Sequence, residues 1–158
     1  MKIAIGSDER THLTDFVIED LKRRGHEILP IGPLAENDPE TDWPLTSSKV
    51  GEAVAARQAD EGIVFCWTGT GASIAANKVS GIRAALCHDA TTAAGARTWN
   101  HANVLALSLR ATPEGIAKEI LDAWFATPYS SDKWNCRQME RIQQLEERAQ
   151  ARKEQAEA

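Results

Sequence analysis

Apolar residues follow two alternating patterns along the chain. Some short runs are almost continuously apolar, which is typical of strands buried on both faces of a sheet. Between these runs, positions such as Leu13, Val17 and Leu21 are spaced as on one face of a helix. The predicted strands are residues 1–7, 27–31, 63–66, 82–89 and 103–109. Strands that alternate with helices imply right-handed crossovers, so we expect an α/β fold with a parallel sheet covered on both faces.

Glycine and proline set the expected boundaries of these elements. Gly25 is a plausible stop for the first helix, and Pro30 marks the second strand as an edge of the sheet. The prolines of the polar segment 32–44 predict a loop without regular structure, followed by a helix over residues 47–58. Thr112 and Pro113 resemble the cap and first position of the helix that follows the last strand.

The composition changes after Pro128. Residues 133–158 are charged and favour a helix, with Met139, Ile142 and Leu145 three positions apart. One narrow apolar stripe cannot stabilise an isolated helix in water, so we expect this helix to pack on a partner subunit. The chain therefore divides into an α/β domain, residues 1–128, and a C-terminal helical extension, residues 129–158. We expect about the last ten residues to fray.

Composition and charge narrow the class of protein. An apolar share of 42% and a charged share of 26% are ordinary for a globular protein, and no apolar run is long enough to span a membrane. The first residues become polar too soon for a signal peptide. Cys66, Cys87 and Cys136 form no disulfide framework, which favours reduced thiols and a cytoplasmic protein. A net charge of −5 argues against nucleic acid as a partner.

Residues 61–78, EGIVFCWTGTGASIAANK, carry the most distinctive motif. A buried strand runs into a glycine turn and then into a helix rich in small residues. Such a turn lets backbone N–H groups approach a ligand and hold an anion. Cys66 stands where the strand meets the turn, so it is a candidate nucleophile or base. The alternative is a buried cysteine with a purely structural role.

Polar residues also follow other predicted strands. Asp8, His88 and Arg110 each stand at a strand's carboxyl end. In open parallel sheets ligands bind outside these ends, so we expect a site there that includes Cys66.

Read together, the central motif, the GSD near the start, TDWP, GIRAAL and the tail resemble the ribose-5-phosphate isomerase B / galactose-6-phosphate isomerase family. The resemblance covers residues 1–142. It implies a three-layer α/β/α Rossmann-like domain with five parallel strands, acting as a homodimer or larger oligomer whose sites use residues from both subunits. It also implies aldose–ketose isomerisation of a sugar phosphate through an enediolate, without cofactor or metal.

The resemblance assigns roles to individual residues. Cys66 matches the family's base, and Thr68 the residue that assists it. The backbone amides from Gly69 through Thr70, Gly71 and Ala72 to Ser73 match the donors that hold the developing oxyanion. The remaining matches are Asp8 and Asn100, which contact the sugar, and Arg110 and Arg137, which clamp the phosphate.

Several positions depart from the family pattern. Histidines of the family are replaced by Glu9, by Trp99 where the family has its ring-opening residue, and by Trp134 beside Lys133 in the tail. Trp67 follows the catalytic cysteine in place of glycine, and Trp43 replaces a tyrosine. All of these are expected in the substrate pocket. His101 could take over ring opening, or it could be an exposed histidine at a helix end.

The departures leave the substrate and the activity open. A tetrose phosphorylated on its terminal oxygen cannot close a furanose, so an enzyme acting on it needs no ring-opening acid. Trp43 and Trp67 would also shorten the pocket, which favours such a substrate over ribose 5-phosphate. The alternatives are a sugar-phosphate-binding protein without catalysis and, more weakly, a nucleotide-binding domain, for which a Walker lysine is missing.

Overall fold

The computed structural model describes residues 1–157. Five parallel strands form one sheet in the order β2-β1-β3-β5-β4. The strands are β1 (Lys2–Ser7), β2 (Glu27–Ile31), β3 (Glu61–Cys66), β4 (Ala84–Leu86) and β5 (Val104–Ser108). The central strand β3 pairs with β1 on one side and with β5 on the other. The parallel five-stranded sheet and the edge position of β2 with its Pro30 are as predicted.

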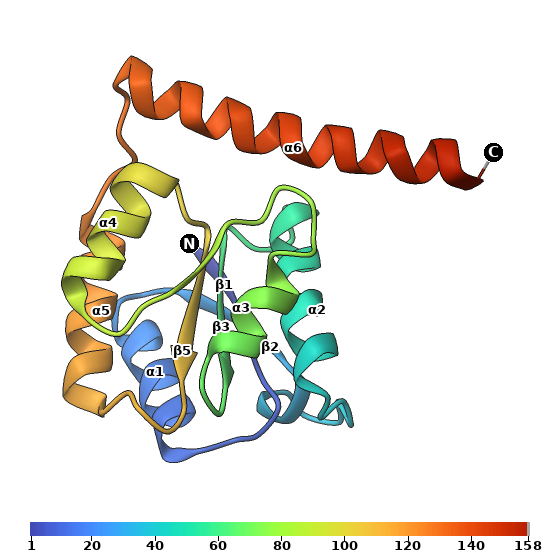
Figure 1. Cartoon of the computed structure of the whole chain (residues 1–158). Helices are drawn as coiled ribbons and strands as arrows, with labels where there is room; N and C mark the ends of the chain where they lie inside the picture. The colour runs from blue at the N-terminus through green and yellow to red at the C-terminus, as the bar shows by residue number, and fades with distance from the viewer. Residues whose placement is uncertain (158) are drawn as a thin grey trace.

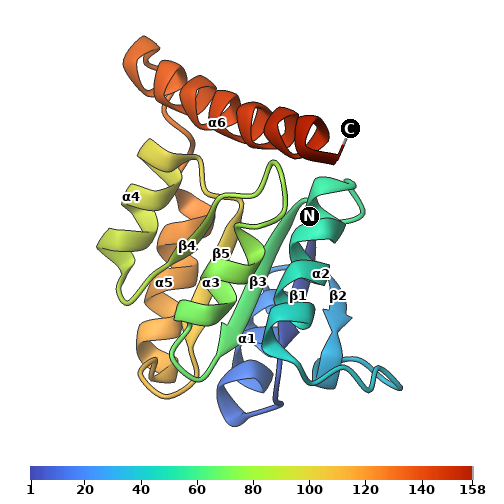
Figure 2. The ribbon, with the colours of Figure 1, turned by 45° about the vertical axis from the view of Figure 1, so that its right-hand side comes forward.

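Helices cover both faces of the sheet, as Figure 2 shows. One layer holds α1 (His12–Arg23), α4 (Ala90–Asn100) and α5 (Glu114–Ala126), and the other holds α2 (Trp43–Ala55) and α3 (Thr70–Ala76). Alternate strand residues fill the two resulting cores, because successive side chains point to opposite faces. Phe65 thus packs with α1 and α5, whereas Val64 and Cys66 pack with α2 and α3. Trp124 is fully buried between the sheet and the helices of the first layer.

The segment 32–44 is more regular than its prolines predicted. It contains a short 3₁₀ helix, Gly32–Leu34, and α2 begins at Trp43 instead of Ser47. Pro33 and Pro44 lie in the first turns of these helices, where a missing N–H breaks no intrahelical bond. The expectation of an irregular segment is therefore wrong at both of its ends.

Other boundaries shift by a few residues. The fourth strand is only Ala84–Leu86, shorter than the predicted 82–89. Pro113, and not Thr112, is the N-cap of α5. The last helix, α6 (Lys133–Glu157), continues through the residues expected to fray. Within residues 1–157, none of the helices is long and apolar enough to span a membrane.

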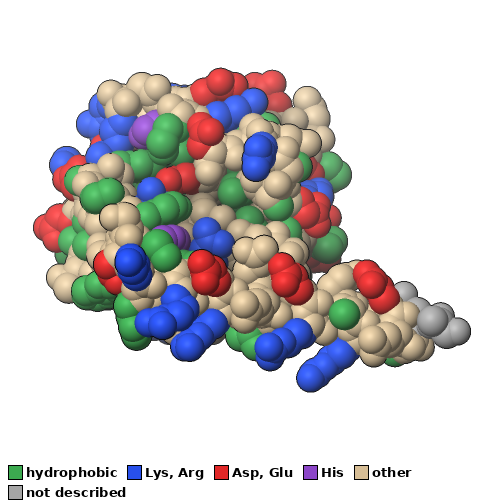
Figure 3. Space-filling view, turned by 90° about the horizontal axis from the view of Figure 1, so that it is seen from above, with side chains coloured by type: hydrophobic (Ala, Val, Ile, Leu, Met, Phe, Trp, Pro, Cys, Tyr) green, Lys and Arg blue, Asp and Glu red, His purple; other side chains and the backbone are tan. Residues whose placement is uncertain are grey.

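Helix α6 lies across the amino-terminal edge of the sheet, where β1 begins, and projects beyond the domain (Figure 1). It is attached to the loop before β4, because Glu146 Oε2 accepts hydrogen bonds from Ser80 Oγ at 3.2 Å and from Gly81 N at 3.0 Å. Figure 3 looks onto this side of the molecule, and Lys and Arg side chains line the outer edge of the helix. Ile142 and Leu145 of the predicted stripe are exposed in the single chain.

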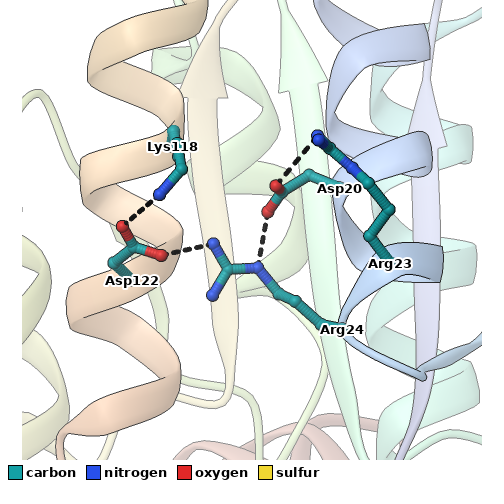
Figure 4. Close-up of polar contacts among 5 residues, drawn as sticks. All are labelled: Asp20, Arg23, Arg24, Lys118 and Asp122. Carbon is teal, nitrogen blue, oxygen red and sulfur yellow. Dashed lines mark hydrogen bonds and ion pairs between the residues drawn. The ribbon is translucent and has the colours of Figure 1, made fainter.

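A polar cluster joins α1 to α5, in the helical layer that also holds α4 (Figure 4). Arg24 Nε lies 2.5 Å from Asp20 Oδ2, and its Nη2 lies 2.5 Å from Asp122 Oδ1. Arg23 also pairs with Asp20, and Lys118 with Asp122. Because the Asp20 carboxylate is buried, Arg24 supplies the counter-charge that it needs.

Candidate active site

The turn between β3 and α3 has a backbone that only glycine suits at one key position. Gly69 is the N-cap of α3 and has a φ of 76°, in the left-handed region. A Cβ there would lie 2.6 Å from Leu86 Cδ1 and 2.9 Å from the carbonyl carbon of Leu107. The turn is therefore pressed against β4 and β5, and its amides are held in place by the sheet.

Cys66 lies under this turn. Its side chain is 6% exposed, and its Sγ accepts a hydrogen bond from the Ala72 N–H at 3.4 Å. Its carbonyl accepts hydrogen bonds from the amides of Gly69 and Leu109. All three cysteines of the chain are free thiols. The sulfur thus sits beside the first turn of α3 with one backbone donor already directed at it.

The five amides predicted to hold an oxyanion are not equivalent. Gly69 N–H binds the Cys66 carbonyl, Ser73 N–H binds the Gly69 carbonyl, and Ala72 N–H binds the Cys66 sulfur. Among residues 1–157, no hydrogen bond is formed by the amides of Thr70 and Gly71, which lie in the first turn of α3. The structure therefore narrows the available donors to these two.

Asp8 lies next to Cys66 along the edge of the sheet. Ser7 pairs with Phe65, so Asp8 and Cys66 follow on neighbouring strands. Burial raises the pKa of the Asp8 carboxyl, while its own amide and that of Glu9 lower it. Its Oδ1 is buried and has no hydrogen-bond partner within the described chain. Glu9 itself is exposed.

Trp43, Trp67, Thr68 and Arg110 belong to the same edge. The Trp43 ring covers Gly71, since a Cβ at Gly71 would lie 3.0 Å from ring atoms. The Trp67 carbonyl accepts hydrogen bonds from Ser108 Oγ at 2.9 Å and from the Arg110 amide at 3.1 Å. The side chains of Trp67, Thr68 and Arg110 are exposed. We call these residues, with Asp8, Glu9, Cys66 and Gly69–Ser73, the carboxyl-edge group.

Apart from His88, which is exposed just beyond the carboxyl end of β4, the remaining predicted site residues lie at the opposite edge of the sheet. Helix α4 starts beyond β4 and runs back, so that it ends beside the start of β5, where the Asn103 N–H binds the Arg83 carbonyl. Strand β3 separates the two edges, and from Gly62 to Cys66 it spans about 13 Å. We call the residues at this second edge the amino-edge group: Trp99, Asn100, His101, Lys133, Trp134 and Arg137. One chain therefore does not bring the predicted site together.

Two grooves flank α6 at this edge. Trp99, Asn100 and Trp134 line the smaller one, of about 570 Å³, with Gln138, Met139, Arg141, Ile142 and Leu145. His101 lines the other, with residues 77–81 and an adjacent face of α6 that shares Met139 and Ile142 with the first groove. Its ring stacks on Tyr129 with centroids 4.7 Å apart, and its Nε2 lies 3.0 Å from the Ser130 carbonyl. His101 therefore lines a different groove from the one that Asn100 lines.

One cluster near this edge went unnoticed in the sequence. Arg97 lies between the rings of Trp124 and Tyr129 and pairs with Glu61 at 2.7 Å. A signal was present, because Arg97 is the lone charged residue of the α4 sequence ATTAAGARTWN. Among residues 1–157, no group of three or more His, Cys, Asp or Glu side chains is arranged to hold a metal ion.

Proteins of known family and structure resemble this chain in sequence and fold. The model of a family described as Ribose/Galactose Isomerase matches residues 3–145. The chain belongs to this family. It is 38% identical over 148 residues to ribose-5-phosphate isomerase B of Escherichia coli, covering 93% of this chain and 97% of the relative. Ribose-5-phosphate isomerase B of Clostridium thermocellum superposes with a TM-score of 0.86 at 37% identity, over 94% and 99% of the two chains.

A third relative differs in the sugar that its name states. D-erythrulose-4-phosphate isomerase of Pectobacterium atrosepticum is 38% identical over 127 residues, covering 78% of this chain and 82% of the relative. The ribose/galactose isomerase family and the three-layer α/β/α fold predicted from the sequence are confirmed. The predicted class of enzyme, an aldose–ketose isomerase, is confirmed as well.

Proposed function

We propose that the chain isomerises a sugar phosphate through an enediolate, with Cys66 as the base. The Cys66 sulfur takes a proton from the carbon next to the substrate carbonyl and returns it to the neighbouring carbon. The observation that carries this proposal is the placement of Cys66 Sγ against the Ala72 N–H, beside two unoccupied amides. The first donor stabilises negative charge on sulfur, and the other two face the place where the oxyanion develops.

Thr68 and Asp8 complete this half of the proposed chemistry. The exposed Thr68 hydroxyl, two residues after the base, assists it by hydrogen bonding. The half-buried Asp8 carboxyl lies beside Cys66 at this edge, where it can accept a hydrogen bond from a substrate hydroxyl. Arg110 supplies positive charge at the same edge for the phosphate.

We further propose that a second copy of the chain completes the site with its amino-edge group. Asn100 and Arg137 are exposed at the far edge of their own chain, and they can reach a Cys66 only in another copy. The exposed stripe of α6 supports this arrangement, because packing on a second copy would bury it. Lys133 and Trp134 belong to the same donated surface. We assign His101 a structural role, since its ring stacks on Tyr129 and its Nε2 lies beside the Ser130 carbonyl.

For the substrate we propose a four-carbon sugar phosphate. Trp43 lies against the first turn of α3 and occupies space at one wall of the site. Trp99 replaces the ring-opening histidine implied by the family resemblance, and a 4-phosphorylated tetrose arrives with its chain open. The relative named D-erythrulose-4-phosphate isomerase supports the same choice.

Solvent deuterium uptake tests the role of Cys66. The wild-type protein in D₂O should incorporate deuterium into the sugar phosphate at the reacting carbon. Cys66→Ala should lower that exchange by at least about a hundred-fold, because a positioned base is lost, while the affinity for substrate stays within a few-fold. Cys66→Ser should also be poor, since a hydroxyl is a far weaker acid than a thiol. Full exchange in Cys66→Ala would remove the assignment, and no exchange in the wild type would favour a protein that only binds the sugar.

The substrate proposal is tested by the ratio of kcat/KM for two sugar phosphates, measured on one preparation of the protein. We expect kcat/KM for D-erythrulose 4-phosphate to exceed that for ribose 5-phosphate. A strong preference for the pentose would mean that another residue opens the sugar ring, with His101 the first to test.

A further inference from the structure

A buried ion pair lies at the amino-terminal end of β3, directly behind the end of α4. Arg97 Nη2 is 2.7 Å from Glu61 Oε1, and both side chains are largely buried. The other carboxylate oxygen, Glu61 Oε2, accepts a hydrogen bond from Trp124 Nε1 at 2.6 Å. Replacing a buried pair of this kind by apolar residues is often neutral or stabilising, so stability alone does not account for it.

The guanidinium also holds the turn that follows α4. Arg97 Nη1 donates to the Ala102 carbonyl at 2.7 Å and contacts the Tyr129 hydroxyl at 2.9 Å. The Tyr129 hydroxyl donates to the same Ala102 carbonyl at 3.2 Å. The planar fork of arginine can contact Glu61, Ala102 and Tyr129 together, which the single ammonium group of a lysine cannot do.

This turn carries an unusual backbone conformation. His101 is the C-cap of α4 and has a φ of 47°, which a residue with a side chain rarely adopts. Its ring lies flat on Tyr129, and its carbonyl accepts a hydrogen bond from Arg83 Nε at 2.8 Å. The conformation is thus fixed on several sides by contacts that include the partners of Arg97.

The two residues immediately before the turn are displayed outward. Trp99 is 60% exposed, and Asn100 is exposed with no side-chain hydrogen bond to the rest of residues 1–157. The turn therefore follows two largely exposed side chains, of which the Trp99 ring also lies over Gly95 of its own helix. In the proposed function these are the side chains that enter the site of a second copy.

We infer that Arg97 is a positioning residue, which fixes the end of α4 so that Trp99 and Asn100 enter the partner's site in the productive orientation. The inference rests on the proposed function, specifically on the shared site. Its mechanical basis is a short chain of contacts from Glu61 through Arg97 to the Ala102 carbonyl and Tyr129. A small displacement of a group that orients the substrate can cost as much as about a hundred-fold in rate.

Mixing of subunits tests this role. The Arg97→Lys homo-oligomer should have a kcat/KM lower by about ten-fold or more. It should then be mixed with an excess of the inactive Cys66→Ala chain. In mixed dimers, the Cys66 of the Arg97→Lys chain meets Asn100 from a chain whose Arg97 is intact. Activity per Arg97→Lys chain should therefore rise towards the wild-type value, which a loss of stability within its own chain would not allow.

Two variants are needed as references. Arg24→Lys changes the arginine of the α1–α5 ion pairs, away from the end of α4, and it should leave kcat/KM unchanged. Asn100→Ala should be inactive alone and rescued by the same Cys66→Ala chain. Should Arg97→Lys fold poorly, Tyr129→Phe removes the hydroxyl but keeps the ring, and it should show the same rescue after a loss of about five-fold.

The possible outcomes distinguish the role of Arg97 from the proposal that two copies share the site. Rescue of Asn100→Ala without rescue of Arg97→Lys would overturn the role of Arg97 and leave the shared site intact. If neither variant is rescued, the shared site is wrong, and the inference falls with it. A wild-type kcat/KM in Arg97→Lys would overturn the inference directly.

Discussion

The two halves of the proposed site lie at the two edges of the sheet and differ in kind. At the carboxyl edge, the sheet and the backbone do most of the positioning: Gly69 is wedged against β5, and the Cys66 sulfur lies beside the amides of α3. At the amino edge, the proposed functional groups are exposed side chains on the end of α4 and the start of α6. In the proposed site, the first half is positioned within one chain, and the second acts only on a substrate bound to another copy.

This difference indicates where each half can tolerate change. Backbone donors cannot be replaced by mutation, but the surrounding packing can displace them. Exposed side chains can be replaced with little harm to the fold, and departures from the family pattern occur among them at both edges: Trp99 and Trp134 at the amino edge, and Glu9, Trp43 and Trp67 at the carboxyl edge. Substitutions at the two edges should therefore fail in different ways.

The largest effect on the amino-edge half should come from removing α6. Truncation after Pro128 deletes Lys133, Trp134 and Arg137 along with the exposed apolar stripe. We expect the truncated chain to lose both self-association, measured by analytical ultracentrifugation, and affinity for the sugar phosphate. The α/β domain should remain folded, because its two cores contain no residue of α6.

A shorter truncation provides the control for this prediction. Ending the chain after Gln150 removes only the last part of α6 and keeps the stripe through Leu145. This variant should associate and turn over substrate as the full chain does. A chain ending at Pro128 that stays dimeric and active would show that α6 has no part in the site.

Apart from Cys66 itself, the carboxyl-edge half should be sensitive to change where Trp43 meets Gly71. A methyl group at Gly71 would lie 3.0 Å from the indole ring, so Gly71→Ala must push the ring or α3 aside. We expect kcat/KM to fall by about ten-fold, since displacing an oxyanion donor costs this much or more. Trp43→Ala in the same chain should recover part of the loss, and a double-mutant cycle measures that coupling.

The Trp43 variant also sharpens the substrate proposal. Trp43→Ala alone should shift the ratio of kcat/KM towards ribose 5-phosphate, because the wall of the site recedes. Purely additive effects of Trp43→Ala and Gly71→Ala would contradict the contact between them.

The smallest effect on function should come from a region that belongs to neither half. Arg24→Ala leaves the buried Asp20 carboxylate with the exposed Arg23 alone, so the free energy of unfolding should fall by about 1–2 kcal/mol. Arg23→Ala should cost about 0.5 kcal/mol or less, as exposed ion pairs do. In both variants kcat/KM should stay unchanged, with stability measured by urea unfolding.

The same cluster should weaken in acid. Hydrogen bonds from Lys118 and then from Arg24 lower the pKa of the Asp122 carboxyl from its ordinary value of 3.8. The contribution of Asp122 is therefore fully present above that value and is lost as the pH falls through the lower, folded-state pKa. The difference in stability between wild type and Arg24→Ala should shrink in the same range.

Much of this fold could be predicted from the sequence, because buried parallel strands leave continuous apolar runs and glycine marks the central turn. The prediction of an irregular loop around Pro33 and Pro44 was wrong at both ends, since proline is compatible with the first turn of a helix. The separation of Asn100 from Cys66 follows from the direction of α4, but a list of site residues does not reveal it. The Glu61–Arg97 pair joins distant parts of the sequence, and no local pattern pairs them.

The proposal that a second copy completes the site is tested most directly by a crystal structure of Cys66→Ala with D-erythrulose 4-phosphate bound, since we expect this variant not to turn the sugar over. We expect the sugar to lie at the amides of Thr70 and Gly71 of one chain and to be contacted by Asn100 and Arg137 of another chain. A bound sugar phosphate contacted by residues of one chain alone would contradict this proposal.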